Sequence, residues 1–377
     1  VVNGLKAAHD AGYTPTTVGI DTWAVDFLLL DADGAPIGEP VAYRDGRTAA
    51  MREELEPILP FTKLYARTGI QYQPFNTVYQ LCALKKEHPE QLAAAEHFLM
   101  VPDYLNYRLT GVMANEYTNA STTALVGAIS KDWDDEIINR LGLPRKIFGR
   151  ISTPGTKLGN LSSAVKDYVG FDCTVVLPAT HDTGSAFLAV PARDDKAVYL
   201  SSGTWSLLGT ELDAPILTAD SCQSGLSNEL GANGKINYLK NIIGLWLIQE
   251  SRREYKRRGQ AYSFAELEQQ ALAAEPLRSF IDPDAAEFVA PGDLPGRIQE
   301  FCRKTGQPIP ETAGAVMRCI YESLALKYRY AIEQLSTVTG RAFTTLHVLG
   351  GGTKDRLLCQ MTADCCGLTV KAGPVEA

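Results

Sequence analysis

One stretch near the middle of the sequence constrains the fold more than any other. Residues 175–177 form a short apolar run that is closed by Pro178, a pattern that predicts a buried strand. His181, Asp182 and Thr183 follow in a row, and the small residues after them predict a tight turn into a short helix. The polar trio is therefore expected at the carboxyl edge of a strand, where open α/β sheets bind ligands.

Asp182 is the candidate catalytic base of this stretch. A carboxylate at such an edge can take a proton from a bound hydroxyl group. A second interpretation is that Asp182 only caps the following helix, because Asp is a preferred residue at helix N-termini. The local pattern does not choose between the two.

Length and composition indicate a soluble globular protein of two or three domains. The chain has 377 residues and a net charge of −8, and this acidic balance argues against nucleic acid as a partner. No apolar run is long enough to span a membrane, and the first residues do not resemble a signal peptide. The eight cysteines are scattered without metal-binding spacing, so we expect reduced thiols, no protein-held metal and a cytoplasmic location.

A polar segment without periodicity, residues 191–196, marks the expected domain boundary. The first domain is then 1–193 and the second 194–377. In the first, residues 17–23 and 25–30 predict strands, Asp33-Gly34 predicts a hairpin turn, and residues 76–111 are mostly helical in pattern. A domain that opens on a helix followed by strands suggests that earlier strands are missing.

The second half contains three candidate ligand-binding segments. Residues 197–210 predict a strand–turn–strand hairpin whose small residues, Thr204 among them, can face phosphate, although an ordinary hairpin has the same pattern. A helix is expected from Asn241 to Arg258. The side-chain amides of Asn241 and Gln249 could contact a ligand, although buried amides commonly satisfy backbone groups instead. Residues 344–366 predict a strand, three glycines and a helix, where a ligand can approach the backbone closely.

Taken together, these motifs resemble the FGGY family of carbohydrate kinases, and within it the members that phosphorylate L-rhamnulose. The resemblance spans nearly the whole chain. It rests on residues 19–27, 40–45, 102–104, 116–120, 181–183, 200–206, 240–247, 347–352 and 372–377.

The resemblance implies an α/β, two-domain fold of the actin, hexokinase and Hsp70 type (ribonuclease H-like), with a catalytic cleft between the domains. Domain 1–193 would bind the sugar and domain 194–377 the nucleotide. The implied reaction transfers the γ-phosphate of ATP, with Mg²⁺, to the C1 hydroxyl of L-rhamnulose in L-rhamnose catabolism. The implied partners are a ketose and ATP, with no nucleic acid or membrane, and we expect a monomer.

The resemblance also assigns residues to roles. Asp182 would be the general base, and Ala24, His181, Asp182, Thr183 and Asn241 would hold the sugar. ATP would be bound by Thr204, Gln249 and Gly351. These roles suit the chemistry, because a sugar hydroxyl needs a base and the transferring phosphoryl group needs hydrogen-bond donors.

The sequence departs from the family pattern in several places. Ala24 and Leu230 stand where the family usually has glycine. The amino-terminal phosphate loop, near which Mg²⁺ is usually held, has no counterpart, and neither has the carboxyl-terminal segment, so we expect a fragment. The resemblance further suggests that Cys302 and Cys319 are close enough to pair, although cytosolic thiols are normally reduced.

Other functions remain open at this point. Kinases of xylulose, fuculose or glycerol are the nearest alternatives within the family. An ATPase of the same fold would not need the polar residues expected on the sugar side, which are Trp23, Asp26, Arg44, Asp103 and Asn241. A non-enzymatic sugar sensor would typically carry a DNA-binding segment, and none is visible.

Overall fold

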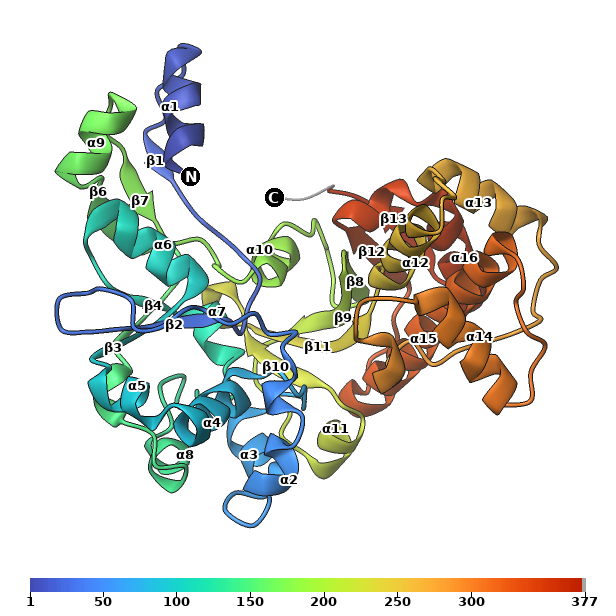
Figure 1. Cartoon of the computed structure of the whole chain (residues 1–377), viewed down its shortest axis with the longest axis horizontal. Helices are drawn as coiled ribbons and strands as arrows, with labels where there is room; N and C mark the ends of the chain where they lie inside the picture. The colour runs from blue at the N-terminus through green and yellow to red at the C-terminus, as the bar shows by residue number, and fades with distance from the viewer. Residues whose placement is uncertain (375–377) are drawn as a thin grey trace. The chain divides into compact units, whose positions relative to one another are not determined.

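The computed structural model describes residues 1–374, which form two compact units (Figure 1). Unit 1 consists of Val1–Leu188 together with Glu211–Tyr238. Unit 2 consists of Ala189–Thr210 and the chain from Leu239 onward. Each unit is therefore built from two separate segments of the chain. The last three residues of the motif at 372–377 lie outside the described residues.

A three-stranded sheet in unit 1 carries the central stretch of the sequence. Its order is β1 (Thr17–Val18), β7 (Thr174–Val176) and β6 (Lys157–Asn160), and β1 and β7 are parallel. Val175 of β7 is fully buried in an apolar core with Val169 and Phe171. Because β1 and β7 run in the same direction, the loops that follow them leave the same edge of the sheet. Helices α1 (Val2–Asp10), α6 (Val101–Thr110) and α9 (Ser163–Val169) also belong to this part of unit 1.

The expected strand at residues 25–30 and the expected helical region at 76–111 are both shorter than predicted. Strand β2 begins only at Phe27, because Val25 has a left-handed backbone with φ 69°. β2 (Phe27–Leu30) pairs with β3 (His97–Met100), which interrupts the helical region. The turn at Asp33-Gly34 is present, but its return strand is reduced to one bridge between Leu30 and Pro36.

The remaining elements of unit 1 are short and join these sheets. Strands β4 (Asn115–Glu116) and β5 (Ile151–Ser152) form a parallel pair. The other elements are α2 (Met51–Leu55), α3 (Phe61–Thr68), α4 (Thr77–Glu87), α5 (Pro89–Ala94), α7 (Tyr117–Ser121), α8 (Asp135–Arg140), α10 (Asp182–Leu188), α11 (Ala219–Gln223) and β10 (Ser227–Leu230), with 3-10 turns at Gly46–Thr48, Arg145–Ile147 and Ala232–Gly234.

Unit 2 is organised around a mixed sheet. The strand order is β10 (Ser227–Leu230), β11 (Ile236–Ile243), β9 (Trp205–Leu212), β8 (Ala197–Ser202), β12 (Thr345–Leu349) and β13 (Thr369–Ala372), and β10, the first residues of β11 and the last of β9 belong to unit 1. β8 and β9 form the expected antiparallel hairpin, and β12 is parallel to β8 and β13. The helices are α12 (Trp246–Arg257), α13 (Phe264–Ala273), α14 (Leu294–Lys304), α15 (Ala313–Thr339) and α16 (Arg356–Cys366), with 3-10 turns at Ala286–Phe288 and Gly351–Lys354.

The helix expected from Asn241 begins five residues later than predicted. Asn241 lies in strand β11, and helix α12 starts at Trp246. Gly244 separates the two, and a Cβ atom at this position would lie 2.8 Å from the backbone nitrogen of Ser206. This close backbone approach explains the glycine and ends the strand.

Helix α15 packs closely against α13 and α14 in unit 2. A Cβ atom on Gly314 of α15 would lie 2.5 Å from the carbonyl oxygen of Gln270 in α13. Cys302 of α14 and Cys319 of α15 are both buried free thiols whose side chains interact. The two cysteines are therefore neighbours but are not joined.

We expect Gly314→Ala to destabilise unit 2 by about 1–3 kcal/mol, because the added methyl group overpacks the contact with α13. Thermal and urea unfolding would measure the change. Gly4→Ala is the matched control, since Gly4 also lies in a helix, but a Cβ atom there would meet no described atom outside its own helix within 4 Å. The control should be neutral or stabilising by up to about 1 kcal/mol. Equal stability of the two variants would contradict the packing argument.

Candidate active site

The loops that follow β1 and β7 are bound to each other at the sheet edge. The backbone N–H of Thr22 donates to the carbonyl of Thr180 at 2.9 Å, and the N–H of Asp182 donates to the carbonyl of Thr22 at 2.9 Å. Thr22 and His181 form an isolated parallel bridge. The polar trio is therefore at the carboxyl edge of β7, held against the loop that follows β1.

The carboxylate of Glu116 also holds the loop before His181 in place. Its carboxylate is fully buried and accepts five hydrogen bonds, from the backbone and hydroxyl of Thr118, the backbone of Asn119, and the backbone and hydroxyl of Thr180. Burial raises the pKa of Glu116, and these donors oppose the rise. One carboxylate thus joins the start of α7 to the loop before His181.

Asp103, which the sequence placed among the residues expected on the sugar side, is buried inside unit 1. The residue is 1% exposed, and its carboxylate accepts the backbone N–H of Glu116 at 3.1 Å. Burial, followed by the negative charge of Glu116, raises the pKa of Asp103 well above its usual range. Asp103 supports Glu116 from inside the unit and is not accessible to a ligand.

Asp182 is the first residue of α10, and its side chain is 57% exposed. Its Oδ1 accepts the backbone N–H of the next residue, Thr183, at 2.6 Å. An N-cap side chain instead accepts the N–H two or three residues further on. His181, whose carbonyl accepts the N–H of Ser185, occupies the cap position. The carboxylate of Asp182 is therefore available to a ligand as well as favourably placed at a helix N-terminus.

His181 lies between two carboxylates. Its Nδ1 is 3.1 Å from Oε2 of Glu229, and its Nε2 is 3.5 Å from Oδ1 of Asp182. Burial disfavours the charged imidazolium, but the negative charges of Glu229, Asp182 and Glu116 outweigh it, so the pKa of His181 is raised. The raised pKa favours the doubly protonated ring.

The loop that carries Ala24 is also polar. Trp23 is half exposed, and its indole N–H donates to Oδ2 of the buried Asp26 at 2.9 Å. Burial raises the pKa of Asp26, while this hydrogen bond opposes the rise. Trp23 therefore presents an aromatic face to solvent while its ring orientation is fixed, which suits a residue that packs against a sugar.

Val25, inside this loop, has the left-handed backbone that β-branched residues avoid. Its carbonyl accepts hydrogen bonds from the hydroxyl of Thr77 at 2.8 Å and from the side-chain amide of Gln80 at 3.1 Å. These buried bonds hold the unfavourable conformation. Backbone strain of this kind concentrates at functional sites, and here it determines the course of the loop between Trp23 and Asp26.

Unit 2 brings the three predicted ATP-binding residues to one end of its sheet. Thr204 lies in the β8–β9 turn, and its carbonyl accepts the backbone N–H groups of Gly244 and Trp246 at 3.2 Å. Gln249 lies one turn into the helix that begins there. Gly351 begins the 3-10 turn after β12, which is the strand next to β8. The fourth predicted residue of this unit, Asn241, is half-buried on β11.

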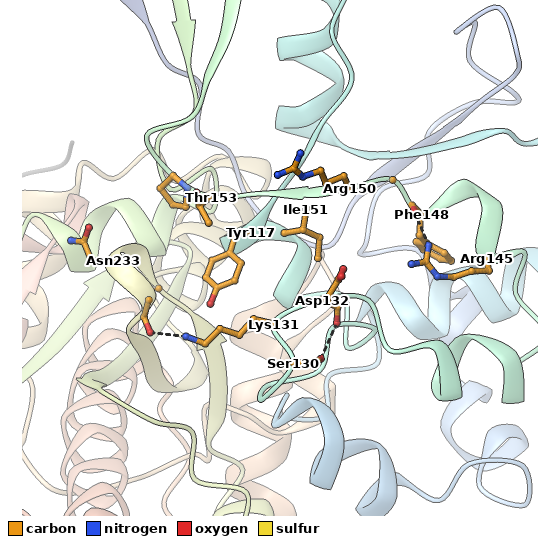
Figure 2. Close-up of a pocket in the computed structure, with 14 residues that line it drawn as sticks. Tyr117, Ser130, Lys131, Asp132, Arg145, Phe148, Arg150, Ile151, Thr153 and Asn233 are labelled. Carbon is orange, nitrogen blue, oxygen red and sulfur yellow. Dashed lines mark hydrogen bonds between the residues drawn. The ribbon is translucent and has the colours of Figure 1, made fainter.

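A cavity of about 780 Å³ in unit 1 is lined by none of the predicted site residues (Figure 2). Its lining includes Tyr117, Lys131, Arg145 and Arg150. Lys131 is already bound to the carbonyl of Gly234. Figure 2 shows that the three cationic side chains do not converge on one point, so the cavity is not arranged to hold a single anion.

Comparison with known proteins decides the family. The sequence models for the N-terminal and C-terminal domains of the FGGY family of carbohydrate kinases match residues 7–189 and 198–377. The rhamnulokinase of Halalkalibacterium halodurans is 46% identical over 377 residues, covering 100% of this chain and 80% of that protein. The chain belongs to the FGGY family of carbohydrate kinases. The rhamnulokinases of Oceanobacillus iheyensis and Bacteroides thetaiotaomicron are each 44% identical and are covered to 79% and 77% of their lengths.

Solved structures confirm the fold of this FGGY kinase. Gluconate kinase from Lactobacillus acidophilus matches with a TM-score of 0.78 at 15% identity, over 98% of this chain and 74% of that one. Xylulose kinase from Rhodospirillum rubrum matches with a TM-score of 0.77 at 19% identity, over 100% and 76%. The predicted family and its two-domain α/β kinase fold are thus both confirmed.

Sequence reasoning missed the parts played by Glu116 and Glu229 in the kinase. Both belong to segments that stand out in the sequence only for their likeness to the family. The signal that could have identified them is an acidic residue within a strand pattern. Residues 227–230, for example, form a buried strand although the first three are polar. A buried acidic side chain needs a hydrogen-bonding or charged partner, so each of the two residues indicated a contact with another part of the chain.

We expect Glu116→Gln to lower the free energy of unfolding of unit 1 by about 1.5–3 kcal/mol, the range for hydrogen bonds to a charged group. The amide loses one acceptor oxygen and places a donor against the donors of Thr118 and Thr180. Urea denaturation would measure the loss. Glu90→Gln, at an exposed site beside His88, is the control and should change stability by less than about 1 kcal/mol. Similar values for the two variants would contradict the supporting role of Glu116.

Proposed function

We propose that this kinase transfers the γ-phosphate of ATP to the C1 hydroxyl of L-rhamnulose, giving L-rhamnulose 1-phosphate and ADP. The observation that carries the proposal is the 44–46% identity to several rhamnulokinases along the whole chain. A role in L-rhamnose breakdown, a cytoplasmic location and a monomeric state belong to the same proposal.

In this proposal unit 1 binds the sugar and supplies the base. Ala24, His181, Thr183 and Asn241 contact the ketose. The exposed carboxylate of Asp182 accepts the proton of the attacking hydroxyl as its oxygen bonds to phosphorus. The exposure of Asp182 and its fixed backbone support this assignment, because a base must reach its substrate without having to be reoriented.

Thr204, Gln249 and Gly351 bind ATP in this proposal. Their common position at one end of the sheet in unit 2 supports it, and the hydroxyl of Thr204 can donate to phosphate oxygens. No group of three or more His, Cys, Asp or Glu residues within residues 1–374 is arranged to hold a metal ion. Mg²⁺ would be coordinated mainly by the phosphates of ATP and by water, as is usual for this ion. No helix in this described part is long and apolar enough to cross a membrane.

A panel of ketoses and polyols tests the substrate. ADP formation should be measured with L-rhamnulose, L-fuculose, D-xylulose and glycerol at equal concentrations. We expect kcat/KM for L-rhamnulose to exceed the others by at least about 10-fold, which corresponds to roughly 1.4 kcal/mol of preferential transition-state binding. A higher value for any other acceptor would replace L-rhamnulose as the assigned substrate.

We expect Asp182→Asn to keep ketose binding but to lose about 10²- to 10⁴-fold in turnover, the usual contribution of a general base. Asn preserves the shape of the side chain and can hydrogen-bond the hydroxyl, yet it cannot take the proton. Calorimetry would measure binding, and ADP release would measure turnover. Near-normal turnover would remove Asp182 from the catalytic role, and lost binding would make it mainly a sugar ligand.

Thr204→Val is the comparison variant for this experiment. It should raise KM for ATP and leave ketose binding unchanged, because its hydroxyl is proposed to contact phosphate only. If Thr204→Val weakened ketose binding as strongly as ATP use, the division of roles between the two sets of residues would be refuted.

A further inference from the structure

Glu229 is a buried carboxylate with a single cationic neighbour in the described part of the chain. Its side chain is 6% exposed, and His181 is the only basic side chain of residues 1–374 that lies within 4 Å of it. A buried carboxylate is costly unless a positive charge compensates it. The pair therefore needs His181 in its protonated form.

The backbone on both sides of Glu229 is held in place. The N–H of Leu230 donates to the hydroxyl of Ser121 at 3.0 Å, and the N–H of Asn228 donates to the carbonyl of Gly69 at 2.8 Å. The N–H of His181 in turn donates to the hydroxyl of Thr118 at 3.2 Å. The backbones of both residues are therefore fixed. The contact between their side chains then determines the orientation of the imidazole ring.

The orientation of the ring has a consequence for Asp182. Because Nδ1 faces Glu229, Nε2 is left facing Asp182 at 3.5 Å. Only the imidazolium form can donate from both nitrogens. We propose that Glu229 is a positioning residue, whose charge keeps the ring of His181 protonated on both nitrogens, so that Nε2–H faces the Asp182 carboxylate and orients it toward the sugar hydroxyl. The last step of this proposal rests on the proposed function, whereas the coupling of Glu229 to His181 does not.

Four carboxylates act on His181 electrostatically, and two of them, Glu229 and Asp182, also contact it. Glu229 approaches from β10, Asp182 from α10, Glu116 from the start of α7 and Asp21 from the loop after β1. Together they outweigh burial and raise the pKa of His181 above its usual 6.5. Glu229→Gln removes one of these charges but keeps an oxygen that can accept from Nδ1. The pKa of His181 should then fall, and the imidazolium should be lost at a lower pH than in the unaltered protein.

Nitrogen NMR of histidine-labelled protein measures this coupling without any substrate. The His181 signals can be assigned from their absence in His181→Gln. We expect a lower titration midpoint for His181 in Glu229→Gln. Asp134→Asn is the matched control, since Asp134 is a buried carboxylate of the same unit that pairs with Arg67, and it should leave the midpoint unchanged. An unchanged midpoint in Glu229→Gln would overturn the proposal.

Enzyme kinetics test whether the charge of His181 affects the action of Asp182. The kcat of the unaltered protein should decline on the alkaline side as His181 loses its proton, and this decline should move to lower pH in Glu229→Gln. At a fixed alkaline pH we expect a loss of about 10- to 100-fold in kcat, the range typical when hydrogen-bond partners of metal-ligating histidines are removed. The KM for the ketose should change much less. A uniform loss with an unmoved pH profile would indicate a merely structural role and would overturn the proposal.

A double-mutant cycle provides a readout that does not depend on pH. If Glu229 acts through His181, adding Glu229→Gln to His181→Gln should change kcat by less than about 2-fold, because the interaction is already gone. Independent, multiplying losses would overturn the proposal. If the unaltered protein phosphorylates no ketose of the panel, the proposed function fails, and the NMR titration alone still decides whether Glu229 controls His181.

Discussion

The five hydrogen bonds received by Glu116 are the interaction on which the candidate active site depends. They join the start of α7 to the loop that presents His181 and Asp182, and the same loop is bound on its other side to Thr22. A charged acceptor suits this task, because hydrogen bonds to an ion are stronger than those between neutral groups. The loop can therefore leave the carboxylate of Asp182 exposed without being mobile itself.

The carboxylates of unit 1 differ in their surroundings, and therefore in their charge and accessibility. Asp103, in the interior beside another acid, is pushed toward its neutral form, whereas Glu116 is satisfied by donors. Asp182 remains open to solvent, and Glu229 is matched by an imidazolium. Burial and neighbouring charge thus give four chemically similar groups different environments.

Local pattern was sufficient for the elements that are defined by their own residues. The strand, turn and helix around Asp182, the β8–β9 hairpin and the strand–glycine–helix segment at Gly351 all follow from apolar runs and turn residues. Features that depend on distant contacts could not be predicted in this way. The late start of α12 depends on how closely Gly244 approaches Ser206, and the partner of β2 is a strand that was hidden in a helical pattern. The contact of Glu229 with His181 joins positions 48 residues apart in sequence, and its chemistry is invisible until the strands are paired.

The division of unit 1 into two chain segments has a consequence for biosynthesis. Residues 211–238 complete this unit, so it cannot finish folding until the ribosome has made the hairpin β8–β9 as well. At about 5–20 residues per second, several seconds separate the synthesis of His181 from that of Glu229. During this interval the nascent chain carries the imidazole without its buried counter-ion. The buried charge pair of unit 1 can therefore form only after β10 has been synthesised.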